Sequence, residues 1–328
     1  MFISANFINN VTETLRKFHS IWYNNLIRRI GGHFILELKE ISVADKELFE
    51  SYMSRPYYRG SECAFGNLFM WQTCYDIFWT EAHGFLVLKV KRNDVDFFLQ
   101  PFGGKDEDLP LLMKEIKEYH NGKPFEIHGI YDDGRERLLK AFPDLEITDD
   151  RDNWDYVYLQ QNLATLAGRK YHGKKNHCNA FVKEHPDYVY EEMNRSNIEE
   201  CLAFGDMWCE RRMSDDPSLV CEKCAIHEAL DNFEALKLRG GVIRIDGKVE
   251  AFSFGEKIND DTAVLHVEKA NPEIRGLYAV INRDFAKNAW GDVTYLNREE
   301  DMGHEGLRMA KESYKPEFMV KKYSTIFK

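Results

Sequence analysis

The segment TYLNREEDMGHEGLRMAKESYKP (294–316) decides how the second half of this chain folds, because it reads as a strand, a polar turn and a helix. The strand VTYLN places Val293, Tyr295 and Asn297 on one face. Five polar residues, 297–301, follow it directly, and the next helix stops before Pro316. Ligands of mixed α/β sheets usually bind where strands end in this way. We therefore expect a functional site at residues 297–301.

Several side chains of this segment suit group-transfer chemistry. Arg298 can hold a carboxylate or phosphate with two parallel hydrogen bonds, and Asp301 either binds substrate or caps the following helix. The helix carries a basic stripe, which is either an anion-binding edge or a solvated face. Tyr314 either donates a proton to a leaving oxygen or belongs to the core. The expected catalytic residues here are Asn297, Glu299 and Tyr314, and the expected substrate-binding residues are Arg298, Asp301, Arg308 and Lys311.

The strand AVLHVEKA (263–270) adds a further candidate, Glu268. Strict alternation puts His266 and Glu268 on one face and Leu265, Val267 and Lys269 on the other. Glu268 lies at the end of a predicted central strand, where it can act as a general base or bind a substrate ammonium group. The alternative is an ion pair with Arg275 or Lys269. We expect the acceptor cleft between this strand and the one that ends at Asn297.

The two halves of the chain repeat one order of elements. Each reads as a strand, one or two helices, three antiparallel strands, a helix, a strand, a helix and a strand. The last of these strands is EFMVKKYSTIF (317–327). We predict an extension over residues 1–33 and two mixed α/β domains over 34–160 and 161–328. The second begins with a basic linker helix at 161–186 that carries Arg169, Lys170, Lys174 and Lys175. Asp246-Gly247 predicts a tight hairpin turn.

The composition narrows the function classes. The chain has 328 residues, 44% of them hydrophobic, and a formal net charge of −11, which excludes a broad nucleic-acid-coating surface but leaves room for one local basic site. Seven irregularly spaced cysteines without a secretion signal indicate reduced thiols in the cytoplasm. We expect CEKC (221–224) to pack on a helix and not to bind zinc, and we expect no metal site. No apolar run predicts stable membrane insertion.

The element order resembles the GCN5-related N-acetyltransferase fold, here in tandem. Four motifs resemble a bacterial family of uncharacterised proteins related to the C-terminal domain of phosphatidylglycerol lysyltransferase: AFGNLFMW (64–71), LAGRKYHGKKNHCNAF (166–181), HVEKANPEIRGLYAVINRDFA (266–286) and YLNREEDMGHEGLRMAKESYKP (295–316). The resemblance covers about 34–328. Relatives of that family, including the Fem-type peptidyltransferases, move an aminoacyl group from charged tRNA to an amine or hydroxyl. The membrane-spanning region of the lysyltransferases has no counterpart here, so we do not expect a lipid acceptor.

The resemblance also bears on the donor. Acetyl-coenzyme A enzymes of this fold hold pyrophosphate at a glycine-rich turn that opens a helix. The corresponding stretch, EIRGLYA (273–279), has Glu273 and Tyr278 at positions that should be basic or small, although a shifted turn would let Arg275 and Gly276 serve. Standard coenzyme A binding is therefore weakened.

The function we expect is acyl transfer. An aminoacyl or acyl group would move from an activated donor, such as aminoacyl-tRNA, to an amine or hydroxyl of a small molecule or peptide, with no further cofactor. The basic linker would then bind tRNA phosphates. The alternatives are an acetyl-coenzyme A-dependent N-acetyltransferase and a non-catalytic tandem domain that binds a peptide or an amino-acid metabolite.

Overall fold

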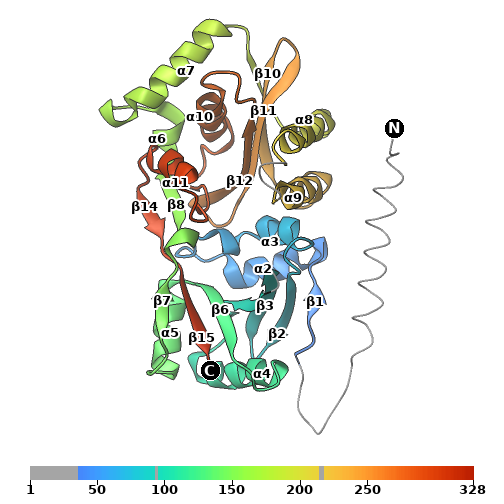
Figure 1. The fold of residues 1–328 in the computed structure, drawn as a ribbon, viewed down its shortest axis with the longest axis vertical. Helices are drawn as coiled ribbons and strands as arrows, with labels where there is room; N and C mark the ends of the chain where they lie inside the picture. Colours follow the sequence, from blue (N-terminus) through green and yellow to red (C-terminus); the bar gives the residue numbers. More distant parts are fainter. Residues whose placement is uncertain (1–35, 93–94, 214–217) are drawn as a thin grey trace, which may run out of the picture. The chain divides into compact units, whose positions relative to one another are not determined.

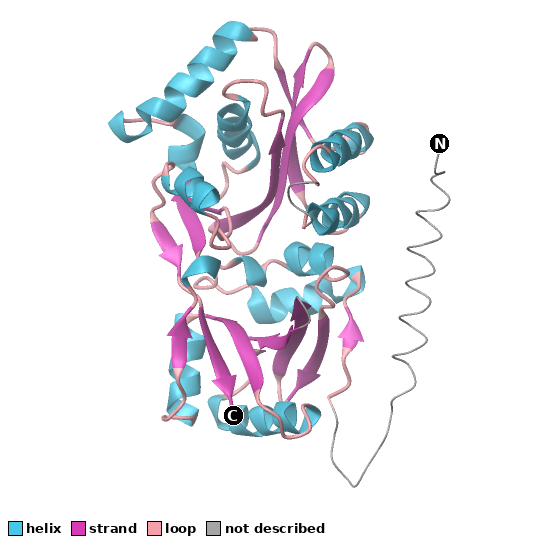
Figure 2. Ribbon diagram, viewed as in Figure 1, coloured by secondary structure: helices cyan, strands magenta, loops and turns pink. Residues whose placement is uncertain are grey.

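Two mixed β-sheets organise the protein in the computed structural model, which describes residues 36–92, 95–213 and 218–328. Each sheet contains one parallel strand pair among its described strands, and its other pairs are antiparallel. Figure 2 shows the sheets in magenta with helices packed against them. The predicted mixed α/β class is confirmed. The extension predicted for residues 1–33 lies outside the described residues.

The first sheet has the order β1-β2-β3-β4-β6-β15-β7, with β5 also paired to β3. Its strands are β1 (Lys39–Glu40), β2 (Phe78–Ala82), β3 (Phe85–Arg92), β4 (Val95–Leu99), β5 (Phe102–Gly103), β6 (Phe125–Ile130), β7 (Ile147–Asp149) and β15 (Tyr323–Phe327). Its helices are α2 (Lys46–Met53), α3 (Phe65–Trp71), α4 (Leu109–Tyr119) and α5 (Asp132–Ala141). In Figure 1, α2 and α3 lie between this sheet and the second one.

The second sheet has the order β14-β8-β13-β12-β11-β10-β9. Its strands are β8 (Asp155–Leu159), β9 (Val189–Glu192), β10 (Arg239–Ile245), β11 (Lys248–Lys257), β12 (Thr262–Ala270), β13 (Tyr295–Asn297) and β14 (Phe318–Val320). Its helices are α6 (Gln160–Thr165), α7 (His172–Glu184), α8 (Ile198–Glu210), α9 (Leu219–Asp231), α10 (Leu277–Ala289) and α11 (Glu305–Glu312). The predicted hairpin turn is present, and both Asp246 and Gly247 have positive φ, as a two-residue turn of this kind requires.

The two sheets exchange strands across the boundary predicted at residue 160. β8 precedes that boundary but pairs with β13 and β14 of the second sheet. The single last strand predicted over 317–327 is two strands, because β14 joins the second sheet and β15 pairs with β6 and β7 of the first (Figure 1). The ranges 34–160 and 161–328 therefore do not coincide with the sheets. The predicted linker helix is likewise two helices, α6 and α7, separated by a turn in which Leu166 and Gly168 have positive φ.

A β-bulge in β12 changes which side chains share a face. Phe254 pairs with Val267 and Gly255 pairs with Leu265, so His266 is an extra residue in β12. Side chains after a one-residue bulge point to the opposite face from the one that strict alternation predicts. The expectation that Leu265 and Val267 share a face is therefore wrong, since they belong to different hydrophobic clusters. The bulge also places Glu268 on the face that α10 covers.

Two large hydrophobic clusters stabilise the fold. One contains buried residues of α2, α3, α8 and α9 together with both sheets, such as Phe49, Phe65, Leu230 and Phe252. The other lies on the opposite face of the second sheet and includes buried residues of α7 and α10. Among the residues that the structure describes, no helix combines the length and the apolar character that crossing a membrane requires.

Candidate active site

The strands β12 and β13 separate at the position where the sequence predicts a cleft. They pair in parallel only over Thr262–Val264 and Tyr295–Asn297. β12 continues to Ala270, whereas the main chain after Asn297 bonds to β8: the N–H of Arg298 donates to the carbonyl of Tyr156 at 3.0 Å. Beyond Val264 the two strands therefore diverge, and a gap opens between β12 and the chain that follows Asn297.

Five side chains meet in this gap and form the gap cluster: Lys174, Glu268, Asn282, Arg298 and Tyr314. Arg298 Nη2 donates to Glu268 Oε1 at 3.1 Å, and Asn282 Nδ2 donates to Glu268 Oε2 at 2.9 Å. Lys174 Nζ lies 4.0 Å from the ring centroid of Tyr314, and the Arg298 guanidinium carbon lies 4.9 Å from the same centroid. The structure thus brings together four residues named from the sequence, which come from α7, from β12, from the turn after β13 and from the turn after α11.

The predicted alternative partners of Glu268 lie elsewhere. Lys269 pairs with Glu222 of α9 at 2.7 Å, and Arg275 is exposed. Glu268 instead pairs with Arg298, which was expected to bind substrate. The alternative ion pairs, with Arg275 or Lys269, are therefore wrong.

The electrostatics of the gap favour a neutral phenol beside two cations. Burial raises the pKa of Tyr314, although Arg298 opposes the change. Burial lowers the pKa of Lys174, and the positive charge of Arg298 lowers it further. Within the described residues, the buried atoms Arg298 Nη1 and Asn282 Oδ1 have no hydrogen-bond partner. Unpaired buried polar atoms are costly, so atoms of this kind mark a place where a ligand can bind.

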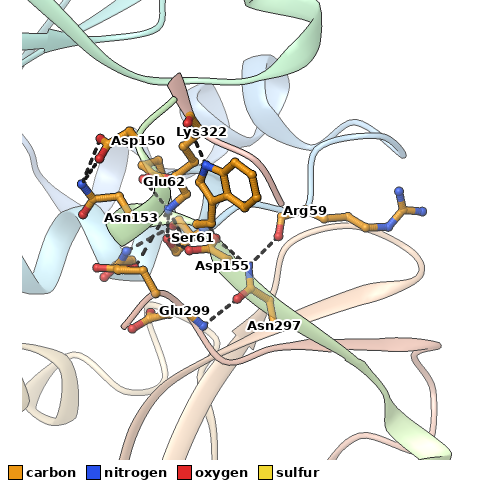
Figure 3. Close-up of polar contacts among 12 residues, drawn as sticks. Arg59, Ser61, Glu62, Asp150, Asn153, Asp155, Asn297, Glu299 and Lys322 are labelled. Carbon is orange, nitrogen blue, oxygen red and sulfur yellow. Dashed lines mark hydrogen bonds and ion pairs between the residues drawn. The ribbon is translucent and has the colours of Figure 1, made fainter. Parts of the chain in front are cut away.

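A second polar group, the interface network, lies between the two sheets (Figure 3). It consists of Ser61, Glu62, Asp155, Asn297 and Lys322. Lys322 Nζ lies 2.6 Å from Glu62 Oε1 and 2.7 Å from Asp155 Oδ1, and it donates to Ser61 Oγ at 3.1 Å. Asn297 Nδ2 donates to Asp155 Oδ2 at 2.8 Å, and Asn297 Oδ1 accepts from the N–H of Glu299 at 2.6 Å. Asn297 is fully buried, so its side chain belongs to this network and not to the gap.

Glu299 and Glu300 also contact buried cations. His266 bonds to Glu299 at 2.9 Å and to Glu256 at 3.1 Å. Burial alone would lower the pKa of His266, but the bonds to these two carboxylates raise it to about 9. Burial raises the pKa of Glu300 to about 7; the charge of Lys322 opposes this rise, and the charges of Asp155, Glu299 and Glu62 add to it.

The remaining predicted substrate-binding residues hold the turn and helix in place. Asp301 is fully buried, accepts two hydrogen bonds from Arg308 at 2.9 and 2.8 Å, and accepts one from the hydroxyl of Tyr156 at 2.6 Å. It also accepts from the N–H of Gly303 at 2.9 Å, so it stabilises the turn before α11. Lys311 donates to the main-chain carbonyls of Arg298 and Glu300. These contacts fix the segment that presents Arg298.

The predicted donor-binding residues divide into three places. Arg169 and Lys170 in the turn before α7 and Lys175 within α7 are exposed, whereas Lys174 turns into the gap. Gly276 precedes α10 with φ of 84°, and a Cβ atom there would come within 2.4 Å of the carbonyl oxygen of His177. The main chain of α7 therefore packs directly on the turn that would have to hold pyrophosphate.

Sequence reasoning missed Asn282, Asp155, Glu62 and Lys322. Asn282 lies in the middle of a buried helix and Asp155 lies in a buried strand, and a polar residue in either setting is a usable signal. Glu62 and Lys322 have no such signal, because their neighbours in the sequence carry no pattern that predicts burial.

The comparisons with known proteins agree with this architecture. A conserved protein of unknown function from Bacteroides thetaiotaomicron VPI-5482 is 36% identical, with a TM-score of 0.84 over 89% of this chain and 100% of that one. L-PGS from Bacillus licheniformis is 15% identical, with a TM-score of 0.60 over 89% and 93%, which shows a shared fold. An uncharacterised protein of Mycoplasmoides gallisepticum (strain R(low / passage 15 / clone 2)) is 22% identical over 66% of this chain and 70% of its own length.

These likenesses confirm the predicted fold, two GCN5-related N-acetyltransferase-like domains in tandem. The family model of the C-terminal domain of phosphatidylglycerol lysyltransferase matches residues 56–326. The chain belongs to the phosphatidylglycerol lysyltransferase C-terminal family.

Proposed function

We propose that this protein transfers an aminoacyl group from an activated donor, such as aminoacyl-tRNA, to an amine or hydroxyl acceptor in the gap between β12 and β13. Family and fold indicate an acyltransferase related to the lysyltransferases. The observation that carries the finer proposal is the gap cluster itself, where Glu268, Arg298 and Tyr314 meet beside an unpaired strand edge. A diverging strand offers main-chain groups that can hold an amide-like substrate.

In this proposal Tyr314 supplies the proton that the leaving group needs. The acceptor nitrogen or oxygen attacks the ester carbonyl carbon, and the bond from that carbon to the donor oxygen then breaks. The leaving oxygen takes the phenol proton of Tyr314, and the proton lost by the acceptor restores the phenol. Because burial raises the pKa of Tyr314, the phenol stays protonated at neutral pH, as a proton donor must. Glu268 positions Arg298 next to the reacting groups.

Two observations support aminoacyl-tRNA over acyl-coenzyme A as the donor. α7 covers the turn at Gly276, and Arg169, Lys170 and Lys175 form an exposed basic row without an acidic residue among them. Three phosphate contacts would give a log–log salt dependence of binding with a slope of about −2 to −3. The acceptor is a small molecule or peptide, and the cytoplasmic location inferred from the cysteine pattern stays a prediction.

The test supplies each donor class separately. The protein is incubated with tRNA charged with labelled amino acids, or with acetyl-coenzyme A, together with a panel of amines and amino alcohols. We expect acceptor-dependent release of uncharged tRNA, and we expect the Lys175→Glu change to weaken tRNA binding more than Lys183→Glu, on the same helix. Thiol release from acetyl-coenzyme A would favour the N-acetyltransferase alternative. No turnover with either donor, combined with ligand-induced stabilisation, would favour the non-catalytic alternative.

A further inference from the structure

The gap cluster carries more positive than negative charge. Lys174 and Arg298 face a single carboxylate, Glu268, and Glu268 already uses one oxygen for Arg298 and the other for Asn282. The chain as a whole has a formal net charge of −11, so this local excess is opposite to the overall charge. Two half-buried cations beside one aromatic ring repel each other, and an anion bound between them offsets this repulsion.

The other lysines in buried surroundings show that Lys174 is unusual. Four of the five buried lysines lie within 4 Å of a carboxylate: Lys46 with Glu256, Lys89 with Asp96, Lys269 with Glu222, and Lys322 with Glu62. The fifth, Lys311, donates to two main-chain carbonyls. Within the described residues Lys174 has no ion pair, and its contact is the ring of Tyr314 at 4.0 Å. Arg298 Nη1 is a second unused donor in the same place, buried and without a partner among the described residues.

We infer that the gap binds an anionic group of the substrate, a carboxylate or a phosphate, between Lys174 and Arg298. This inference rests on the proposed function for its location, and it narrows the substrate to a molecule with an oxyanion near the reacting bond. Arg298 keeps Nη2 on Glu268 and offers Nη1 to the anion, while Lys174 supplies the second charge. Charge-assisted hydrogen bonds of this kind are stronger than neutral ones.

The experiment measures anion binding without turnover. Sodium phosphate, sodium N-acetylglycinate and neutral N-acetylglycinamide are added at constant ionic strength, and the unfolding midpoint and the heat of binding are recorded. We expect the two anions to raise the midpoint and the amide to leave it unchanged. Binding of phosphate alone, or of the carboxylate alone, would support the site and show which of the two anionic groups of a substrate it binds. Absence of any anion-specific effect at concentrations up to about 50 mM would overturn the inference.

A matched pair of variants locates the site. Lys174→Gln should weaken anion binding by about ten-fold or more, whereas Lys183→Gln, the same change at an exposed position of α7, should leave it unchanged. Equal weakening in both variants would show diffuse attraction and overturn the inference. Anion binding without acyl transfer would sink the proposed function and leave this site standing. Acyl transfer that proceeds without anion binding would overturn this inference and leave the proposed function standing.

Discussion

The interface network and the gap cluster flank the same short segment, 297–301, yet they differ in how completely their polar atoms are paired. In the interface network, Lys322 reaches two carboxylates and a hydroxyl, and both the oxygen and the nitrogen of the Asn297 amide are hydrogen-bonded. In the gap cluster, two buried atoms have no partner among the described residues, and Lys174 has no ion pair there. A network whose polar atoms are all hydrogen-bonded stabilises a fold, whereas buried polar atoms without partners can bind a ligand.

The largest effect expected from this comparison is on stability, at Lys322. Replacing it with Met leaves Glu62 and Asp155 buried without a counter-ion, which typically costs about 3–5 kcal/mol of unfolding free energy. Urea denaturation measures this cost. Lys321→Met, at the exposed neighbouring position, should change stability by no more than about 0.5 kcal/mol. A cost at Lys322 as small as that at Lys321 would show that the network does not hold the sheets together.

The next effect is on turnover, at Tyr314. Tyr314→Phe removes the proposed proton donor and should lower the rate of acyl transfer about 100-fold, the usual range for losing one such donor. Stability should change little, because phenylalanine keeps the aromatic ring that lies beside Lys174 and Arg298. Single-turnover kinetics with charged tRNA measures the rate, and Tyr295→Phe on β13 is the control. An unchanged rate in Tyr314→Phe removes Tyr314 from the mechanism.

A smaller effect on turnover is expected at Glu268. Glu268→Gln can keep a hydrogen bond to Arg298 but removes the negative charge, so the guanidinium is held less firmly. We expect about a ten-fold lower rate and a loss of about 1–2 kcal/mol in stability. The rate per folded molecule and the urea midpoint are measured together. A stability loss of several kcal/mol with an unchanged rate per folded molecule would make Glu268 a structural partner only.

The sequence predicted the elements well because helices and strands depend on local periodicity. It could not predict partners that depend on distant contacts. The residues 317–327 read as one strand, and only the competing strands β8 and β6 reveal that they form two. The bulge at His266 reversed the expected faces of β12, since a one-residue slip leaves no mark in the apolar pattern. Even so, the sequence selected four of the five residues of the gap cluster, from the ends of two strands, from the helix after them and from the basic linker.

The candidate site was harder to predict than the fold because nearby polar residues have different roles. Asn297 and Arg298 are adjacent, but one belongs to the interface network and the other to the gap cluster. Asp301 and Arg308 were expected to bind substrate, and they pair with each other. The difference is decided by what lies across the fold, namely Asp155 from β8 and Glu268 from β12, and no local pattern encodes it.

The smallest effect expected is a pH dependence at Glu300, on the border of the interface network. Burial raises the pKa of its carboxyl from about 4.5 to about 7, so the folded state binds a proton that the unfolded state releases. The resulting stability is fully present below about pH 4.5 and is lost as the pH rises to about 7. Because 25% of the Glu300 side chain remains exposed, we expect a loss of only about 1 kcal/mol. Urea midpoints between about pH 4.5 and 6 stay below the range, from about 6.5 to about 9, in which His266 changes stability. Within that window Glu300→Gln should flatten the decline relative to the exposed control Glu305→Gln. Parallel curves for both variants would mean that the Glu300 carboxyl is solvated and takes no part in the network.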